Sequence, residues 1–314
     1  MNFNYHNSNS KLKDANYSGC LDGSHYPSKD FIIPGHVACP GCGAVIAMKF
    51  ALQALGPKTL LVIPACCWAV VAGVHPQTSL KVPVLHTAFE TSGAAASGVR
   101  AALDMKGDKE TLVVAWAGDG GTFDIGFQSL SGACERNENF LYVCYDNEAY
   151  MNTGVQRSSA TPYGARTTTT PGDAWKNRRK KNIIETLVAH RIPYAASVNI
   201  AYPDDMIRKF KKARNIEGTR FIHAYASCPT GWRVPSDQTV KIARLAVQTN
   251  FFPLYEVDDN GTKYTINYSG DRPVSEYLKV QGRFKHLNDK DVQSIQDMVD
   301  EDWKLLKMKQ DNFI

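Results

Sequence analysis

Apolar residues gather along the chain in short runs that are separated by glycine and polar turns. Two of these runs, residues 111–117 and 140–146, are almost wholly apolar, which is typical of strands buried on both faces. Further strands are expected at residues 59–63, 194–200 and 220–227. Helical periodicity lies between them, at residues 44–54, 91–103, 122–134, 183–190, 204–213 and 238–249. This alternation predicts an α/β fold with a mostly parallel, twisted sheet and helices on both of its faces.

The two ends of the chain depart from this pattern. Residues 1–30 are rich in Asn, Ser, Lys and Asp and show little periodicity, which predicts an arm on a neighbouring chain or a disordered extension. Residues 252–268 are typical of a two-stranded hairpin, and residues 289–307 of an amphipathic helix. We therefore expect a main domain over residues 31–270 and a helical extension over residues 271–314 that packs on this domain or on a partner chain.

Composition narrows the class of protein. The chain has 314 residues, 43% of them hydrophobic and 21% charged, which is typical of a globular protein. Its net charge of +5 is too small to indicate a nucleic-acid partner, and no apolar run is long enough for a membrane helix. The N-terminus lacks the apolar segment of a signal peptide, so a cytoplasmic location is expected. The basic run at residues 176–181 is interpreted as a solvated loop, with docking of an acidic redox protein or a phosphate-bearing substrate as the alternative.

A glycine-rich turn follows the first buried run. Gly118-Asp119-Gly120-Gly121 offers main-chain amides to a phosphate and the carboxylate of Asp119 to a divalent cation. Asn147 follows the next buried run, roughly 25 to 30 residues on, and offers a carbonyl oxygen to the same cation. A plain strand-to-helix turn is the alternative. The long polar stretch at residues 149–172 is of a length that is usually functional.

The chain contains eight cysteines, at positions 20, 39, 42, 66, 67, 134, 144 and 228. In a cytoplasmic chain, ligation of a metal or cluster is a better first explanation for them than disulfides. Cys39 and Cys42 form a C-x-x-C pair, Cys66-Cys67 follow an expected strand, and Cys228 lies far along the chain. This arrangement favours an iron–sulfur cluster held by four thiolates. A zinc site and a thioredoxin-like redox pair remain alternatives. Cys134 and Cys144 are expected in the core, and Cys20 is given no role.

Several blocks of sequence together carry a resemblance to a known family. They are Cys39-Pro-Gly-Cys42-Gly-Ala, Gly118-Asp119-Gly120-Gly-Thr-Phe-Asp-Ile-Gly126, Tyr145-Asp-Asn-Glu-Ala-Tyr-Met-Asn-Thr-Gly-Val-Gln156, Ala160-Thr-Pro-Tyr-Gly164 and Cys228-Pro-Thr-Gly-Trp232. In this order, and over nearly all of the chain after Ile33, they resemble the β chain of the 2-oxoacid:ferredoxin oxidoreductases, close to the oxalate and pyruvate enzymes. The resemblance implies a thiamine-diphosphate-binding fold with N- and C-terminal extensions.

The resemblance also implies the ligands of one 4Fe-4S cluster. Cys39, Cys42 and Cys228 match three of the ligands. The remaining ligand belongs to a segment that usually ends in Gly-Cys and here contains Cys66-Cys67, so that Cys67 takes the ligand position. We therefore expect Cys39, Cys42, Cys67 and Cys228 to hold the cluster, with Cys67 also next to the thiamine cofactor.

For the thiamine diphosphate itself, the resemblance implies a set of oxygen ligands to Mg²⁺. Asp119 and Asn147 match the side-chain ligands, and Ala149 matches the ligand that uses its main-chain carbonyl. The glycines Gly118, Gly120 and Gly121 form the turn around the diphosphate. Asn152 matches an asparagine that reaches the reacting part of the cofactor, and it is the expected catalytic residue on this chain.

The reaction implied by the resemblance is the oxidative decarboxylation of a small 2-oxo acid or oxalate, with electrons passed through the cluster to ferredoxin. The glutamate on the pyrimidine ring is expected on a partner α chain, next to a ferredoxin-like δ chain, so this chain is expected to be inactive alone. The segment Ala65-Cys-Cys-Trp68 favours oxalate slightly over pyruvate with coenzyme A. A non-redox thiamine decarboxylase and a zinc-stabilised scaffold subunit are the alternatives from other classes.

Overall fold

The structure is a computed structural model that describes residues 29–74 and 76–311. Its strands are β1 (Thr59–Pro64), β2 (Val84–Thr87), β3 (Leu112–Gly118), β4 (Leu141–Asp146), β5 (Tyr194–Asn199), β6 (Arg220–Tyr225), β7 (Tyr255–Asp258) and β8 (Lys263–Ile266). Its helices are α1 (Gly43–Leu55), α2 (Cys67–Val71), α3 (Ser92–Met105), α4 (Phe127–Glu135), α5 (Ile183–Val188), α6 (Pro203–Arg214), α7 (Pro229–Trp232), α8 (Thr239–Gln248), α9 (Val274–Lys279) and α10 (Asp289–Asp311). Shorter helical turns are η1 (Gly120–Ile125), η2 (Ser236–Gln238), η3 (Asp259–Gly261) and η4 (Gly282–Phe284).

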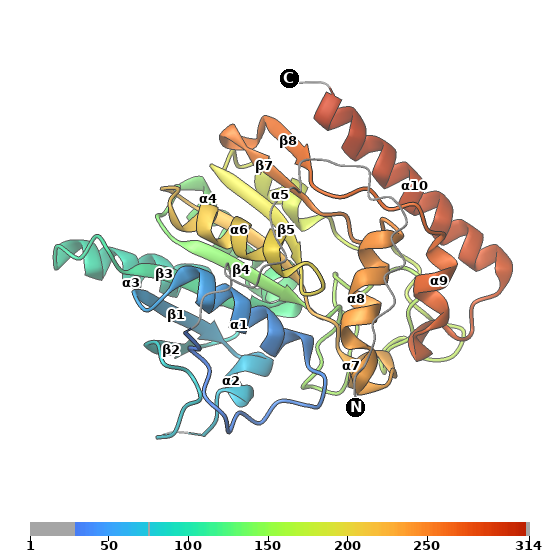
Figure 1. The fold of residues 1–314 in the computed structure, drawn as a ribbon, viewed down its shortest axis with the longest axis horizontal. Helices are drawn as coiled ribbons and strands as arrows, with labels where there is room; N and C mark the ends of the chain where they lie inside the picture. Colours follow the sequence, from blue (N-terminus) through green and yellow to red (C-terminus); the bar gives the residue numbers. More distant parts are fainter. Residues whose placement is uncertain (1–28, 75, 312–314) are drawn as a thin grey trace, which may run out of the picture.

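The strands form one sheet in the order β2-β1-β3-β4-β6-β5-β7-β8 (Figure 1). The six strands from β2 to β5 in this order pair in parallel, whereas β7 and β8 pair antiparallel and form the predicted hairpin at one edge. Helices connect successive parallel strands, which is the connection that parallel pairing requires. The predicted α/β fold with a mostly parallel sheet is confirmed.

Both faces of the sheet are buried, and the central strands show why their sequences are continuously apolar. In β3, Val114 and Trp116 pack into a core under α1 and α6, while Val113 and Ala115 pack into a second core under α3 and α4. In β4, Tyr145 faces the first of these cores. Successive side chains of a strand point to opposite faces, so a sheet covered on both sides needs apolar residues at every position.

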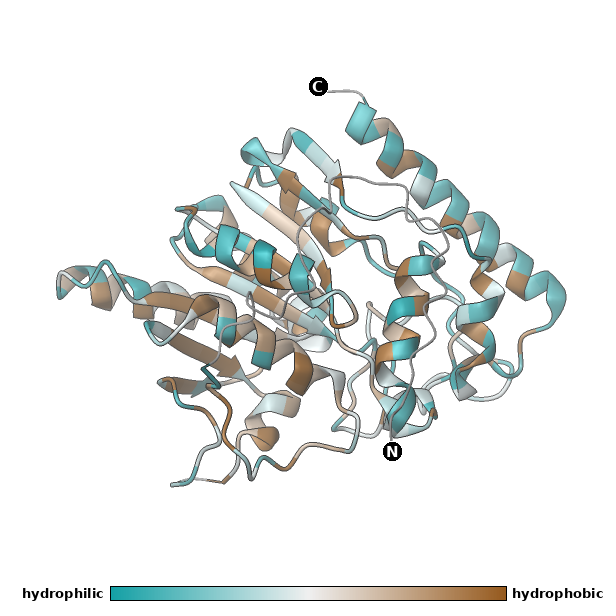
Figure 2. Ribbon diagram, viewed as in Figure 1, coloured by the Kyte–Doolittle hydropathy of each residue, from teal (hydrophilic) through white to brown (hydrophobic). Residues whose placement is uncertain are grey.

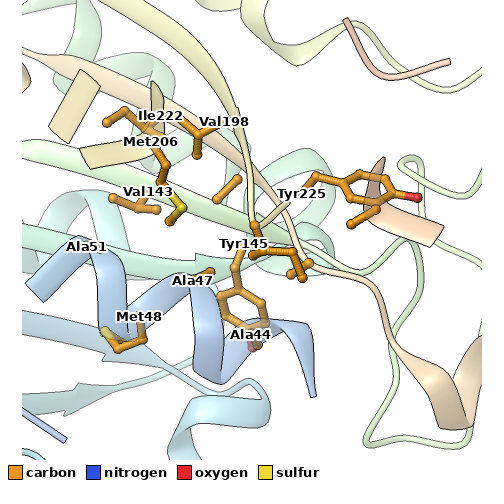
Figure 3. Packing of buried hydrophobic residues seen from close by; sticks show 14 of the residues in the cluster. Ala44, Ala47, Met48, Ala51, Val143, Tyr145, Val198, Met206, Ile222 and Tyr225 are labelled. Atoms are coloured by element: carbon orange, nitrogen blue, oxygen red, sulfur yellow. The ribbon is translucent and has the colours of Figure 1, made fainter. Parts of the chain in front are cut away.

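Helix α1 lies close against the sheet because small residues line its inner face. Ala44, Ala47 and Ala51 are buried there, and Figure 3 shows them beside Val143 and Tyr145 of β4. Alanine lets the helix axis approach the sheet closely without leaving a cavity. This packing places the N-terminal end of α1, with its two preceding cysteines, near the carboxyl ends of the strands.

The helix predicted at residues 122–134 is divided in the structure. Gly120–Ile125 form a turn of π-helix, and α4 begins only at Phe127. A Cβ atom at the intervening Gly126 would lie 2.2 Å from the carbonyl oxygen of Gly121, so only glycine fits this close approach of main chain to main chain. Turns of π-helix occur frequently at functional sites.

The structure corrects in part the interpretation of the basic run at residues 176–181 as a solvated loop, because Asn177, Arg178 and Arg179 are exposed but none of its lysines is. Lys176 is buried and donates to the carbonyl oxygen of Thr161. Lys180 pairs with two buried carboxylates, and Lys181 donates to the carbonyl oxygen of Phe123. All three lysines of the run are therefore held by internal partners, which a pattern of consecutive charges cannot reveal.

The C-terminal helix α10 begins where the sequence predicts and ends slightly later. It buries Ile295, Val299 and Leu306, and apolar and polar residues are mixed along its length, as the colouring in Figure 2 shows. Its outer carboxylates Glu301 and Asp302 pair with Arg179. Most of the predicted arm at residues 1–30, and Cys20 with it, lies outside the described residues. Over the ranges that the structure describes, no helix combines the length and apolarity of a membrane span.

Candidate cofactor and cluster site

Four neighbouring strands end at the same edge of the sheet, and each leads into one of the predicted site residues. Strands β1, β3, β4 and β6 are adjacent and parallel. They lead to Cys67, Asp119, Asn147 and Cys228, respectively. Ligand sites of open α/β sheets lie outside the carboxyl ends of the strands. The topology therefore gathers residues that lie far apart in sequence.

Oxygen atoms of residues that follow strands β3 and β4 lie close together at this edge. One terminal atom of the Asn147 amide lies 2.9 Å from the carbonyl oxygen of Ala149 and 3.0 Å from Oδ1 of Asp119. If that atom is nitrogen, it donates to both oxygens; if it is oxygen, three oxygens face one another as they do around a hard cation. Asp119 is buried, and burial followed by the nearby carboxylate of Asp146 raises the pKa of Asp119. A bound divalent cation would stabilise the ionised carboxylate of Asp119 against burial and against the charge of Asp146. These residues therefore fit Mg²⁺.

The other end of the same amide faces a thiol. With its oxygen toward Asp119 and Ala149, Asn147 donates through Nδ2 to Sγ of Cys67 at 3.8 Å. One side chain therefore touches both the oxygen-rich and the sulfur-rich part of the site. This orientation is the one that suits a cation between the three oxygens.

The glycine turn is shaped by aromatic neighbours. A Cβ atom at Gly120 would lie 2.2 Å from the ring of Tyr150, so the ring occupies the space that a side chain would need. The hydroxyl of Tyr150 donates to Asp124 at 2.8 Å. Gly118 and Gly121 have more room, with the nearest atoms at 3.3 Å and 3.4 Å. The residue that demands glycine most strongly is therefore Gly120.

The polar stretch at residues 149–172 folds back over the turn and supplies a residue that the sequence did not single out. Ser158 donates its hydroxyl to Oδ2 of Asp119 at 2.5 Å, and both side chains are buried. Thr161 donates to the carbonyl oxygen of Glu148 at 2.7 Å. The stretch thus orients the carboxylate of Asp119. Its length was the one signal in the sequence that pointed to such a role.

A buried network of charges lies behind Asn147 and was also missed. Nε2 of His223 lies 2.7 Å, and Nζ of Lys180 2.5 Å, from Oδ2 of Asp146. Lys180 also lies 3.0 Å from Glu148. Burial alone would raise the pKa of Asp146, but Lys180 and His223 lower it to about 2. The residues flanking Asn147 are therefore held by fixed charges.

Two glycines bring the C-x-x-C pair to the same edge. Gly43, at the start of α1, donates its amide to the carbonyl oxygen of Ser227 at 3.1 Å, and a Cβ there would lie 2.7 Å from that oxygen. Gly41 has a φ of +72°, in the left-handed region that favours glycine. These contacts place Cys39 and Cys42 beside the segment that leads to Cys228.

The thiols are neighbours without converging on one point. Burial, then Cys66, Cys228 and Cys42, raise the pKa of Cys67 to about 12. Burial also raises the pKa of Cys228 to about 11, with further contributions from Cys42 and Cys39. Within residues 29–74 and 76–311, no three His, Cys, Asp or Glu side chains lie close enough to hold a single metal ion.

Cys66 and Cys67 face different surroundings. The hydroxyl of Tyr145 lies beside both thiols, but Cys42 and Cys228 raise the pKa of Cys67, whereas the other contacts of Cys66 are with main-chain groups. Cys67 is therefore the residue turned toward the other thiols. Cys134 and Cys144 are buried in the core, as predicted.

The structure does not bring Asn152 into this group. Its side chain is exposed on the turn between Tyr150 and Gln156, which are joined by two main-chain hydrogen bonds of 2.9 Å and 3.0 Å. Its predicted catalytic role depends on groups that would approach this turn from outside the chain.

Comparison with known proteins adds three findings. The family model "Thiamine pyrophosphate enzyme, C-terminal TPP binding domain" matches residues 66–224. Ketoisovalerate oxidoreductase subunit VorB of Pyrococcus abyssi is 52% identical over 293 residues, which cover 90% of this chain and 94% of the relative. Pyruvate synthase subunit PorB of Methanothermobacter marburgensis is 47% identical over 277 residues, which cover 87% and 96%.

A solved structure agrees with the fold. The 2-oxoglutarate:ferredoxin oxidoreductase from Magnetococcus marinus superimposes with a TM-score of 0.56 at 22% identity and covers 71% of this chain and 81% of its own. The matched thiamine-binding domain spans the glycine turn and Asn147, and the two relatives cover nearly the whole chain. This chain therefore belongs to the 2-oxoacid:ferredoxin oxidoreductase family of thiamine-diphosphate enzymes, as one of its β subunits.

Proposed function

We propose that this subunit holds thiamine diphosphate with Mg²⁺ and one 4Fe-4S cluster, in a complex that oxidatively decarboxylates a small 2-oxo acid and passes electrons to ferredoxin. The observation that carries this proposal is that oxygen atoms of Asp119, Asn147 and Ala149 lie together at one edge of the sheet, with neighbouring cysteine thiols beside them. A non-redox thiamine enzyme needs no thiols at this edge. The cysteines therefore favour the redox function.

The proposed cation ligands are Asp119, Asn147 and the carbonyl oxygen of Ala149. Ser158 keeps the carboxylate of Asp119 oriented through its 2.5 Å hydrogen bond. The amides of Gly120 and Gly121 begin the helical turn η1, where anions are favoured. The bound cofactor would supply the electron sink for decarboxylation. The protein's part is to bind it, orient it and exclude water.

The proposed cluster ligands are Cys39, Cys42, Cys67 and Cys228. With the amide of Asn147 in the orientation that suits a cation, two hydrogen bonds reach their sulfur atoms. Nδ2 of Asn147 donates to Cys67 at 3.8 Å, and the main-chain amide of Gly231 donates to Cys228 at 3.4 Å. Hydrogen bonds to ligand sulfurs are one of the factors that set the reduction potential of a cluster. These two donors would help to set it here.

Partner subunits are needed for a complete site in this proposal. The edge of the sheet formed by α2 and β2 exposes Val70, Val74 and Leu85, with 57%, 83% and 42% of their surface accessible. Apolar side chains exposed beside a site favour a protein partner. An α chain there would supply the glutamate for the pyrimidine ring. A ferredoxin-like δ chain and a cytoplasmic location remain predictions.

For the substrate, we infer an aliphatic 2-oxo monocarboxylate. The relatives described above are named for ketoisovalerate and pyruvate, and identity near 50% favours related chemistry in this chain. The pyruvate enzyme, which makes acetyl-coenzyme A, is thus close to the inferred function. The slight preference for oxalate predicted from Ala65-Cys-Cys-Trp68 stays a prediction, and a substrate panel tests it.

The experiment uses the complex purified anaerobically from its natural host. Reduction of ferredoxin is followed with 2-oxoisovalerate, pyruvate, 2-oxoglutarate and oxalate, each with and without coenzyme A. We expect reduction that requires both coenzyme A and an aliphatic 2-oxo monocarboxylate. Reduction by oxalate alone, independent of coenzyme A, would replace our inferred substrate with the oxalate prediction. Decarboxylation without reduction of ferredoxin would contradict the redox function itself.

A further inference from the structure

Arg283 belongs to the short turn η4, far along the chain from the site, yet its guanidinium lies against it. The side chain is buried, with 4% of its surface exposed. Nη2 lies 2.5 Å from Oε2 of Glu148 and donates to the hydroxyl of Tyr277 at 3.1 Å, while Nε donates to Gln281 at 2.9 Å. The planar group is therefore fixed by several partners in its own plane.

The flat face of the same guanidinium contacts the second loop of the site. Cζ of Arg283 lies 4.1 Å from the ring centroid of Trp232, which is the geometry of a cation–π contact. Trp232 ends the turn of helix that starts after Cys228, and its indole nitrogen donates to the carbonyl oxygen of Asn147 at 2.9 Å. The side chain of Arg283 thus contacts both the thiamine-binding loop, at Glu148, and the segment that follows Cys228, at Trp232.

Glu148 explains why this contact matters for the cation ligands. It lies between Asn147 and Ala149 and has a φ of +67°, in the left-handed region that is unfavourable for residues other than glycine. Arg283 and Lys180 hold its carboxylate, and Thr161 holds its carbonyl oxygen. A residue kept in this conformation fixes the directions of the groups on either side of it.

We propose that Arg283 is a positioning residue that fixes the thiamine-binding loop and the cluster-binding segment relative to each other. It acts through Glu148 on the cation ligands and through Trp232 on the segment of Cys228. It touches neither substrate nor cofactor in this proposal. The inference rests on the proposed function, because it assigns a role toward a cation and a cluster.

Three variants of the purified complex test this role. Arg283→Met removes both contacts. Arg283→Lys keeps a cation beside Glu148 but loses the planar contact with Trp232. Arg220→Met is the matched control: Arg220 is equally buried and donates to Ala213 and Asn139, but it starts β6 and so lies at the opposite edge of the sheet. It therefore loses buried hydrogen bonds without touching the site.

Two quantities are measured in each complex: the Kd for thiamine diphosphate at saturating Mg²⁺, from quenching of tryptophan fluorescence, and the electron paramagnetic resonance spectrum of the reduced cluster. We expect Arg283→Met to weaken binding roughly 10- to 100-fold, as loss of a residue that orients metal ligands typically does. We also expect its cluster spectrum to change. Arg220→Met should lower the melting temperature while leaving both quantities at wild-type values.

The outcomes separate this inference from the proposed function. A wild-type complex in which this subunit binds no thiamine diphosphate or no iron contradicts the proposed function and the inference with it. If the wild type binds both and Arg283→Met matches Arg220→Met, the proposed function stands and the inference is wrong. If Arg283→Met does not assemble, Arg283→Lys decides: a changed cluster spectrum supports the inference, and an unchanged one overturns it.

Discussion

The indole nitrogen of Trp232 donates a hydrogen bond of 2.9 Å to the carbonyl oxygen of Asn147. Trp232 follows β6 and Asn147 follows β4, which are neighbouring strands in the sheet. The bond joins the turn that begins after Cys228 to the loop that carries the proposed cation ligands. The two halves of the candidate site are therefore linked inside this chain, before any partner subunit or cofactor is considered.

Replacement of Trp232 by Phe measures how much this hydrogen bond contributes to the free energy of unfolding. Trp232→Phe leaves the buried carbonyl oxygen of Asn147 without its donor, which should cost about 1 to 3 kcal/mol of unfolding free energy. The control is Trp116→Phe, because Trp116 is equally buried and its indole nitrogen has no partner among the described residues. Denaturant unfolding should show the larger loss for Trp232→Phe. Equal losses of unfolding free energy in the two variants would mean that the smaller ring, and not the lost hydrogen bond, causes the destabilisation.

Ser158 orients the carboxylate of Asp119, so its removal should affect binding more than stability. We expect Ser158→Ala to weaken binding of thiamine diphosphate with Mg²⁺ by roughly 10-fold or more. Ser197→Ala is the control, since that buried hydroxyl donates to Pro253 and accepts from Tyr255 within the sheet. Calorimetric titration of both variants provides the comparison. Unchanged affinity in Ser158→Ala would show that Asp119 needs no such support.

Two glycines give opposite predictions for the same substitution. Gly126→Ala places a Cβ 2.2 Å from a main-chain oxygen that cannot move freely, and it should destabilise the protein by roughly 2 to 3 kcal/mol. Gly98 lies in α3 with nothing within 4 Å of its Cβ position. Gly98→Ala should therefore stabilise the protein by roughly 0.5 to 1 kcal/mol. Thermal unfolding would contradict this account if both substitutions shifted the melting temperature in the same direction.

Lowering the pH should reduce the free energy of unfolding through protonation of Glu256, a buried residue of β7 that lies away from the site. Burial alone would raise the pKa of Glu256, but Arg208 and Lys212 lower it from 4.5 to about 2. The folded state therefore binds this proton less tightly than the unfolded state. The resulting stability is fully present above pH 4.5 and is lost as the pH falls toward 2, with a loss on the order of 3 kcal/mol.

Urea unfolding between pH 2 and pH 6 measures this effect. Glu256→Gln should be less stable at pH 6 and should show a shallower decline of unfolding free energy as the pH falls. Glu276→Gln is the control, because Glu276 forms an exposed pair with Arg272 that contributes little. An equally steep decline in Glu256→Gln would assign the acid sensitivity to other carboxylates.

The local sequence pattern was sufficient to predict the main strands and the positions of Asp119 and Asn147 after them. Strands β3 and β4 are buried on both faces, so their apolar runs are unambiguous. Strand β2 was not predicted, because it has four residues at the edge of the sheet, two of them exposed. Its pattern does not differ from that of a loop. The position of Asp119 and Asn147 at strand ends followed directly from the two long runs.

The supporting residues were not predictable in the same way. Arg283 and Glu148 are separated by 135 positions, and Ser158 and Asp119 by 39. No period or motif relates such residues, since the fold alone brings them together. Glu148 carries one further obstacle: a glutamate with positive φ breaks the local preference of its residue type. These are the positions at which tertiary contacts override local sequence.

The most direct test of the central claim is the metal and cofactor content of this subunit in the purified complex. Iron, zinc and thiamine diphosphate are measured in the wild type, Cys228→Ala, Cys67→Ala and Cys66→Ala, with the core substitution Cys144→Ala as control. The account predicts a loss of about four irons in Cys228→Ala and Cys67→Ala only, with thiamine diphosphate retained in all. Zinc in place of iron, or iron content unchanged by Cys228→Ala, would contradict it.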